Sequence, residues 1–317
     1  MHYTVNKSRF KIEGHGRDAG FTDLMKWQLG GGRAKWPRRI ENQVHPPPPQ
    51  RVSGTELSVT WVGHSTVLIQ TAGLNVLTDP FFSQRASPLQ VAGPKRVRDP
   101  GLRLAQLPPI DVVLLSHNHY DHLDVPSLRE LQKHSAPHVV TPLMNDHYVR
   151  RASRKMRVTD LHWRDSVMVG ECRITVMPAL HWSKRSFGDA NRALWGAFVA
   201  ETPGGVIYFA GDTGYGDGST FREVQNTFGA PRLSLLPIGA YEPRWFMKSQ
   251  HMNPDDAVQA HLDLGSSMSL AIHHGTIQLT NEAIDAPVRD LRAALLERGV
   301  DPETFAVADI GQTIGMG

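Results

Sequence analysis

The chain has 317 residues, of which 40% are apolar and 21% charged, and its formal net charge is +3. This length allows one α/β core with an extension. No run reaches the roughly 18 apolar residues that span a bilayer, and the first residues lack the apolar core of a signal peptide. The single cysteine, Cys172, excludes an internal disulfide and a thiolate metal cluster. These features predict a cytoplasmic protein.

The N-terminal segment carries most of the positive charge. Residues 1–51 contain ten Lys/Arg and four Asp/Glu, which favours either an anionic partner or a solvated basic surface. The run Pro46–Pro49 predicts a stiff, extended connector. We therefore expect a basic extension over residues 1–50 and a separate folded domain over residues 51–317.

A short amphipathic helix is predicted within this extension. Phe21, Leu24, Met25 and Leu29 follow the spacing of one helical face. We expect that face to pack on the protein's own core. The alternative is docking on an anionic membrane surface, assisted by four cations: Arg33, Lys35, Arg38 and Arg39.

Strands and helices alternate along the rest of the chain. Gly73 marks the turn of a predicted hairpin between strands 67–70 and 74–78. The other predicted strands are 57–61, 112–115, 174–177, 197–200, 206–210, 233–237 and 269–272. The predicted helices are 125–133, 221–228, 254–264 and 287–298, and the third has a strong start in Asn253 followed by Pro254. Both halves contain strands and helices, which predicts a four-layer α/β/β/α sandwich.

Four residues of types that ligate metals follow one buried strand. His117, His119, Asp121 and His122 lie within six residues, directly after the apolar run 112–115. Alternate residues of an extended segment point the same way, so we expect His117, His119 and Asp121 to converge while His122 serves a second position. Burying these groups without partners would cost several kcal/mol, so a purely structural role is disfavoured.

Three further ligand candidates occupy the same kind of position. His181, Asp212 and His273 each come just after an apolar strand, and functional groups of layered α/β folds gather at one sheet edge. Imidazole and carboxylate ligands without thiolate suit Zn²⁺, with Mn²⁺ or iron as alternatives. Seven ligands exceed the needs of one tetrahedral ion, so we expect two divalent ions.

The motif His117-x-His119-x-Asp121-His122 resembles the signature of the metallo-β-lactamase fold hydrolases. Over residues 55–300 the chain is similar to the family of N-acyl-phosphatidylethanolamine-hydrolysing phospholipases D. The segments that carry this closer resemblance are 61–66, 77–80, 85–88, 93–96, 107–111, 116–124, 194–196, 210–215, 237–248 and Gln250-His251.

The resemblance implies roles for individual residues. His117, His119 and His181 would hold one metal, Asp121, His122 and His273 the other, and Asp212 would bridge them. His251 would contact the substrate or transition state, and Gln90 and Gln250 would lie near the substrate headgroup. Asp121, Asp212 and His251 are thus the expected catalytic residues.

The implied activity is cleavage of an N-acylated phospholipid to phosphatidic acid and an N-acylethanolamine. A phospholipid substrate implies peripheral contact with the inner, anionic face of the membrane. No stable nucleic-acid partner is expected, and the sequence leaves a homodimer open.

Other hydrolases on the same fold use the same ligands. An acyl-homoserine lactone hydrolase and an RNA or cyclic-nucleotide phosphodiesterase are the main alternatives. A non-enzymatic membrane scaffold is disfavoured because every expected ligand is present.

Overall fold

Two seven-stranded sheets face each other in the computed structural model, which describes residues 3–6, 9–12 and 21–316. The first sheet has the order β16-β3-β4-β5-β6-β7-β8. In that order its strands are Thr313–Met316, Leu57–Gly63, Thr66–Thr71, Leu74–Thr78, Val112–Leu114, His138–Pro142 and Arg157–Leu161. The second sheet has the order β15-β14-β13-β12-β11-β10-β9. Its strands are Phe305–Ala306, Ser269–Ile272, Leu233–Pro237, Gly205–Phe209, Ala197–Thr202, Cys172–Met177 and Ser166–Val169.

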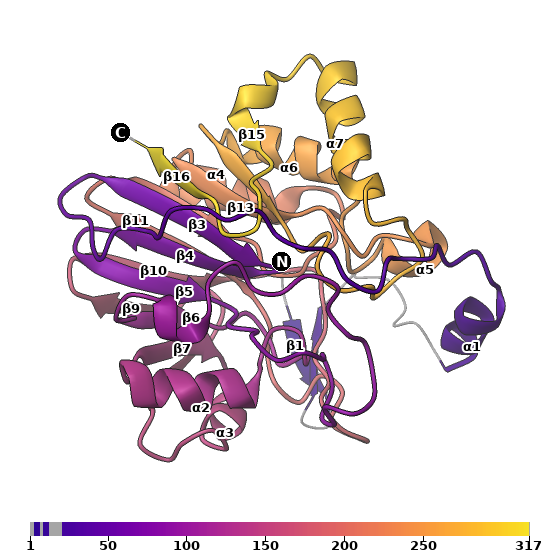
Figure 1. Ribbon diagram of the computed structural model, residues 1–317, viewed down its shortest axis with the longest axis horizontal. Helices are drawn as coiled ribbons and strands as arrows, with labels where there is room; N and C mark the ends of the chain where they lie inside the picture. The colour runs from indigo at the N-terminus through magenta and orange to yellow at the C-terminus, as the bar shows by residue number, and fades with distance from the viewer. Residues whose placement is uncertain (1–2, 7–8, 13–20, 317) are drawn as a thin grey trace.

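Helices cover the outer faces of both sheets, so the expected four-layer α/β/β/α sandwich is confirmed (Figure 1). The first sheet is covered by α2 (Val125–His134) and α3 (Asp146–Val149). The second is covered by α4 (Ser219–Phe228), α6 (Pro254–Leu264) and α7 (Ala286–Glu297). The remaining helical segments are α1 (Phe21–Leu29), α5 (Arg244–Met247), η1 (Leu104–Gln106) and η2 (Pro302–Thr304).

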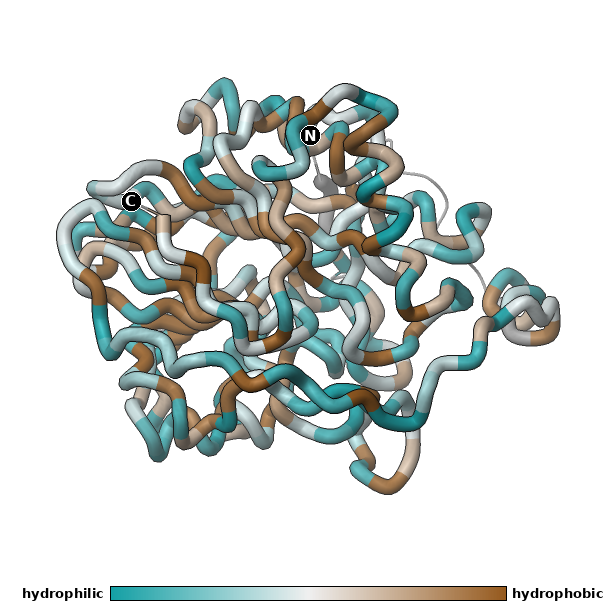
Figure 2. Tube along the Cα trace, turned by 45° about the horizontal axis from the view of Figure 1, so that its top comes forward, coloured by the Kyte–Doolittle hydropathy of each residue, from teal (hydrophilic) through white to brown (hydrophobic). Residues whose placement is uncertain are grey.

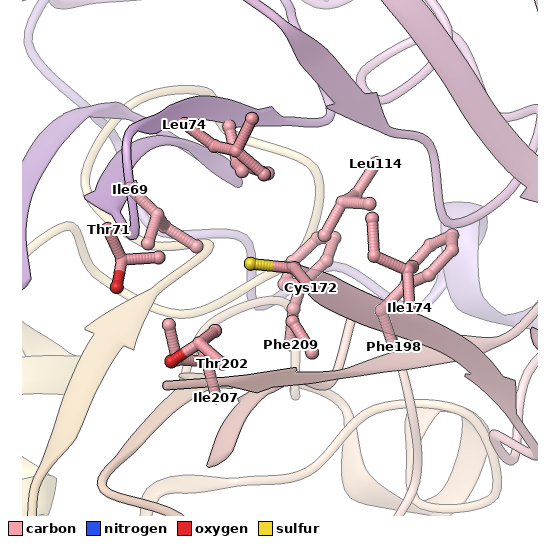
Figure 3. A pocket seen from close by; sticks show the side chains of 12 residues that line it. Ile69, Thr71, Leu74, Leu114, Cys172, Ile174, Phe198, Thr202, Ile207 and Phe209 are labelled. Atoms are coloured by element: carbon pink, nitrogen blue, oxygen red, sulfur yellow. The ribbon is translucent and has the colours of Figure 1, made fainter. Parts of the chain in front are cut away.

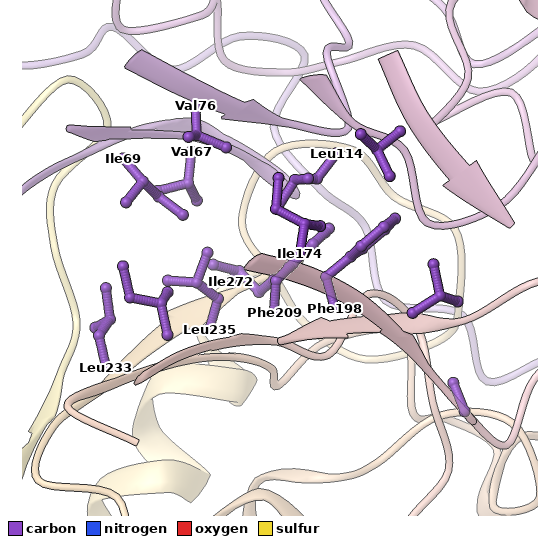
Figure 4. Packing of buried hydrophobic residues seen from close by; sticks show 14 of the residues in the cluster. Val67, Ile69, Val76, Leu114, Ile174, Phe198, Phe209, Leu233, Leu235 and Ile272 are labelled. Atoms are coloured by element: carbon purple, nitrogen blue, oxygen red, sulfur yellow. The ribbon is translucent and has the colours of Figure 1, made fainter. Parts of the chain in front are cut away.

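The main core lies between the two sheets. Val67, Ile69 and Leu114 project from one sheet toward Phe198 and Phe209 of the other (Figure 4). Apolar stretches run along the strands, whereas hydrophilic stretches lie mostly in the outer connections (Figure 2). This burial on both faces explains why several parallel strands are continuous apolar runs in the sequence.

Most helices and strands lie close to where the local sequence predicted them. β13, β14 and α6 have the predicted bounds. The side chain of Asn253 accepts a hydrogen bond from the Asp256 N–H (2.8 Å), and the helix ends at Gly265, whose φ is 61°. Asn253 is therefore a side-chain N-cap, and Gly265 ends the helix in the left-handed conformation that glycine adopts easily.

The N-terminal segment has more structure than its sequence indicates. β1 (Tyr3–Asn6) and β2 (Arg9–Ile12) form a hairpin, and the side chains of Phe10 and Ile12 join the main core. Residues 34–42 then run along the sandwich, because the Ala34 N–H bonds the Asn281 carbonyl and the Ile40 N–H bonds the Val97 carbonyl. The expected boundary near residue 50 stays a prediction.

The helix predicted around residues 21–29 is present as α1, but Met25 and Leu29 of its predicted apolar face do not pack on the core as expected. Met25 and Leu29 are 37% and 79% exposed. The helix is held instead through Trp27, whose ring stacks on Phe246 of α5 at 5.1 Å. Aromatic stacking against one short helix thus holds α1 in place while Met25 and Leu29 stay exposed. Over the described part of the chain, no helix combines the length and apolarity needed to cross a membrane.

Candidate metal centre

The expected ligand residues meet at one edge of the sandwich, where strands of both sheets end. His117, His119, Asp121 and His122 follow β6, His181 follows β10, Asp212 follows β12 and His273 follows β14. Six of the seven side chains are buried and His119 is half-buried, and their ligand atoms fall into overlapping groups that could hold metal ions. The sheet edge therefore places residues that are distant in sequence around one small volume.

Three histidines form the first group. The Nδ1 atom of His119 lies 2.9 Å from Nε2 of His117 and 3.2 Å from Nε2 of His181. Burial lowers the pKa of all three rings, to about 3 for His119 and about 4 for His181 and well below its usual value for His117. Three neutral rings that turn nitrogens toward one point suit a divalent cation.

The second group contains Asp121, His122 and His273, and the carboxylate of Asp212 lies beside it. Nε2 of His122 and of His273 lie 3.4 and 3.5 Å from Oδ2 of Asp121. Burial opposes protonation of His273, but Asp212 and Asp121 outweigh it and raise its pKa to about 9. The pKa values of both carboxyls are held well below their usual range, against burial, by these histidines. The negative charge of the two carboxylates therefore favours a cation bound at the second group.

Asp212 lies between the two groups. Its Oδ2 atom is 3.2 Å from His122 Nε2 and 3.3 Å from His273 Nε2, and 3.8 Å from His181 Nε2 and 4.0 Å from His117 Nε2. A carboxylate at this position can bridge two ions.

The turn that carries the first four ligands differs from expectation. Residues 119–122 form a tight turn, with the His122 and Leu123 N–H groups bonded to the His119 carbonyl. The turn rotates Asp121 away from His117 and His119 and places it with His122 and His273. The expectation that alternation would bring Asp121 to the first pair is therefore wrong, because the extended backbone ends before residue 119.

Buried atoms without partners test whether metal ions fit these residues. Among the described residues, Nε2 of His122, Nε2 of His273 and Oδ1 of Asp212 are buried and make no hydrogen bond. Leaving such groups unsatisfied costs free energy, whereas coordination would satisfy them. The residues present therefore fit two divalent ions, one in each group with Asp212 shared.

Neighbouring residues fix the orientation of the ligand rings. Nδ1 of His122 lies 2.6 Å from Oδ2 of Asp79, and Nδ1 of His117 lies 2.9 Å from Oγ of Ser116. Nδ1 of His181 donates to the Gln250 carbonyl at 3.0 Å. His64, which has a φ of 56°, approaches Asp121 Oδ2 with Nε2 at 2.9 Å. Such partners set which ring nitrogen is free to bind a metal.

The three expected substrate contacts have different outcomes. His251 is buried in the group with His181 and Asp212, and its Nδ1 atom has no partner. Gln250 serves the site through its backbone carbonyl, while its side-chain amide lies at 3.5 Å from the Phe246 carbonyl. The side chain of Gln90 is exposed and bonds its own loop, accepting from the Arg85 N–H at 3.2 Å and donating to the Arg85 carbonyl at 3.3 Å. The described contacts do not bring Gln90 to the metal ligands.

Arg185 is a supporting residue that the sequence did not reveal. Its guanidinium donates to the carbonyls of Asn118 (2.9 Å) and Leu123 (2.7 Å) and lies 4.1 Å from the centre of the Tyr120 ring. The Tyr120 hydroxyl donates back to the Arg185 carbonyl at 2.8 Å. Arg185 therefore ties the loop of His181 to the turn of His117–His122.

Comparison with known proteins agrees with this site. A family model described as a Beta-lactamase superfamily domain matches residues 74–274. The chain belongs to this superfamily of metal-dependent hydrolases, and the superfamily implies divalent metal ions.

Individual proteins that are similar to this chain in sequence or fold add detail to this comparison. The N-acyl-phosphatidylethanolamine-hydrolyzing phospholipase D 1 of Caenorhabditis elegans is 36% identical over 272 residues, which cover 82% of this chain and 76% of that protein. The mitochondrial N-acyl-phosphatidylethanolamine-hydrolyzing phospholipase D of Saccharomyces cerevisiae is 34% identical over 80% of this chain and 55% of its own length. The diiron β-hydroxylase CmlA of Streptomyces venezuelae shares the fold at a TM-score of 0.61 and 18% identity, over 86% of this chain and 55% of its own.

Proposed function

We propose that the protein is a two-metal phosphodiesterase that cleaves N-acyl-phosphatidylethanolamine or a related phospholipid to phosphatidic acid and an N-acylethanolamine. The observation that carries this proposal is the position of Asp212 between the two ligand groups, taken together with two relatives named for this reaction. Two bound ions would activate a water molecule and stabilise negative charge on the phosphoryl oxygens.

The chain's own residues would hold and orient the reacting groups. Asp79, Ser116 and the Gln250 carbonyl keep the ligand rings in place. His251 is buried beside His181 and Asp212, with its Nδ1 atom 4.0 Å from Asp212 Oδ2 and without a hydrogen-bond partner. We assign it a hydrogen bond to a substrate phosphate oxygen, which positions the phosphodiester against the metals.

Zinc is the proposed metal, since histidine nitrogens and carboxylate oxygens suit its tetrahedral preference. The same donor set also binds iron or manganese, and the relative in fold that carries a diiron site illustrates the alternative. Elemental analysis of protein reconstituted with zinc, iron or manganese should give close to two equivalents of the preferred ion. Well under one equivalent of every metal would refute the two-metal site.

Hydrolysis in ¹⁸O-labelled water tests the reaction. The substrate would be N-acyl-phosphatidylethanolamine in detergent micelles, with a lactone and an RNA oligonucleotide as parallel substrates. We expect the label in phosphatidic acid, because water attacks phosphorus. Label in a released fatty acid, or opening of the lactone with the lipid unchanged, would overturn the phospholipase proposal.

Asp212→Asn is the matched variant for this assay. Asparagine keeps the shape of the side chain but removes the charge that two ions would share, so activity should fall by more than about a thousandfold. Asp217→Asn, an exposed aspartate beyond the cluster, should leave activity unchanged.

A further inference from the structure

Large apolar side chains project from the loops that surround the metal centre. Leu89 and Val91, in the connection after β5, are 61% and 86% exposed. Phe187, after β10, is fully exposed, and Trp245 in α5, after β13, is 54% exposed. Each belongs to a connection that leaves the same sheet edge as the metal ligands.

These connections contact one another in a continuous rim. Phe81, Ala86 and Ile277 form a small apolar cluster with Tyr120 packed against it, and Tyr120 bonds to Arg185 in the loop of Phe187. The rim continues from the segment after β14 to α1, because the Trp27 Nε1–H donates to the Asn281 side chain at 2.9 Å. α1 reaches α5 by the stacking of Trp27 on Phe246, and both helices lie on the same side of the sandwich (Figure 1).

The rim is positively charged as well as apolar. Segments 81–99, 182–192 and 238–250 contain nine Lys/Arg and three Asp/Glu. Two of the three acids have partners within the protein. Asp99 forms an ion pair with Arg39 at 3.2 Å, and Asp189 accepts hydrogen bonds from its own loop and from Tyr148. The cations at exposed positions of these segments are Lys95, Lys184, Arg192 and Lys248, and Lys26 lies over the Trp245 ring at 4.9 Å.

We propose that this rim docks on an anionic lipid bilayer, with Leu89, Val91, Phe187 and Trp245 entering the interface; the proposal rests on the phospholipid substrate proposed above. Separate apolar tips interspersed with cations suit a surface whose headgroups are negative and whose acyl region is apolar. Trp245 has the ring type that favours such a boundary. Docking would hold the metal centre over the headgroups, so that a phospholipid reaches the metals without leaving the membrane.

Vesicle sedimentation tests the docking. The full-length protein, loaded with its metal, is mixed with vesicles of phosphatidylcholine alone or with 30% phosphatidylglycerol, neither of which contains N-acylated lipid. We expect binding to rise severalfold with the anionic lipid and to fall with salt.

Leu89→Ser with Phe187→Ser should lower the partition coefficient by about tenfold or more, because each serine removes apolar surface from the interface. Lys95→Gln and Lys184→Gln should each lower it by about fivefold.

Leu262→Ser with Leu296→Ser is the matched control. These leucines are 46% and 84% exposed on α6 and α7, away from the rim, so their replacement should leave the partition coefficient unchanged. Equal binding of both double variants, or binding of the original protein that ignores phosphatidylglycerol, would overturn the proposal. Metal content and thermal midpoint are measured for every variant, so that a folding defect cannot mimic lost docking.

Hydrolysis in micelles separates this proposal from the one on which it rests. The Leu89→Ser, Phe187→Ser variant should cleave N-acyl-phosphatidylethanolamine in detergent micelles at nearly the original rate but lose at least about tenfold on vesicles. If the protein binds anionic vesicles yet cleaves no phospholipid in micelles, the docking stands and the proposed reaction falls.

Discussion

The carboxylate of Asp79 holds two parts of the metal centre at once. It accepts hydrogen bonds from the Ser116 N–H at 2.7 Å and from the Ser116 hydroxyl at 2.6 Å, and it contacts Nδ1 of His122. Asp79 is completely buried, with a φ of 30°. The side chain of Asp79 therefore fixes both Ser116 and His122 in the segment that follows β6.

We expect Asp79→Asn to lower metal affinity by about 10- to 100-fold. Asparagine can donate through its amide nitrogen, so it no longer ensures that His122 presents a free Nε2 atom toward the metals. Competition with a chelator measures the affinity, and Asp99→Asn, on the exposed surface, is the control. An unaltered dissociation constant in a folded variant would show that Asp79 does not orient His122.

Residue types indicated the ligands but not the groups behind them. His117, His119, His181 and His273 were recognisable because imidazoles directly after apolar strands have few structural uses. Asp79 occupies the same kind of position after β5, yet the sequence gives no sign of which carboxylate faces a metal and which faces a histidine. The direction of a hydrogen bond depends on backbone geometry that residue spacing does not fix.

Loops, rather than strands, decide how the ligands divide into two groups. The strands ending at Leu114, Met177 and Phe209 were expected close to where they lie, and they set the edge at which the site forms. The turn at residues 119–122 then separates Asp121 from His119, which an extended segment would not do. The β1–β2 hairpin escaped prediction because four-residue strands give too little alternation to detect.

Arg185 links two of these loops, and its removal should be costly. Arg185→Met keeps much of the side-chain volume but leaves the carbonyls of Asn118 and Leu123 without their donor, so the free energy of unfolding should fall by about 3 kcal/mol. Urea unfolding of the metal-loaded protein measures it. Chelator competition should show weaker metal binding as well, since the loops of His117 and His181 lose their tie.

Arg192→Met provides the comparison for Arg185. Arg192 is in the same loop but exposed, so its replacement should change the free energy of unfolding by less than about 0.5 kcal/mol. If both variants unfold at the same urea concentration, the contacts of Arg185 do not support the loops. Arg185→Lys should recover part of the stability, because an ammonium group can reach one carbonyl but not both.

The sandwich as a whole was predictable because each half repeats the same combination of strands and covering helices. The packing between the two sheets could not be predicted, because it depends on how individual side chains of one sheet fit against those of the other. Between the two sheets lies a cavity of about 20 Å³. Ile69, Leu74 and Phe209 line it, and the Sγ atom of Cys172 points into it (Figure 3). Burial raises the pKa of the Cys172 thiol, which keeps it in the neutral form that suits an apolar lining.

Filling this cavity should stabilise the molecule without touching the metal centre. Cys172→Val places a second methyl-sized group in the space on a strand that favours β-branched residues, so we expect a gain of about 1 kcal/mol in the free energy of unfolding. Met168→Val, at a 54% exposed position on the neighbouring strand β9, should have little effect. Metal content should be unchanged in both variants, because Cys172 is the first residue of β10 whereas His181 follows the other end of that strand. Urea unfolding and elemental analysis measure the two quantities. A loss of stability in Cys172→Val would mean that the sheets pack too tightly there to accept an added methyl group.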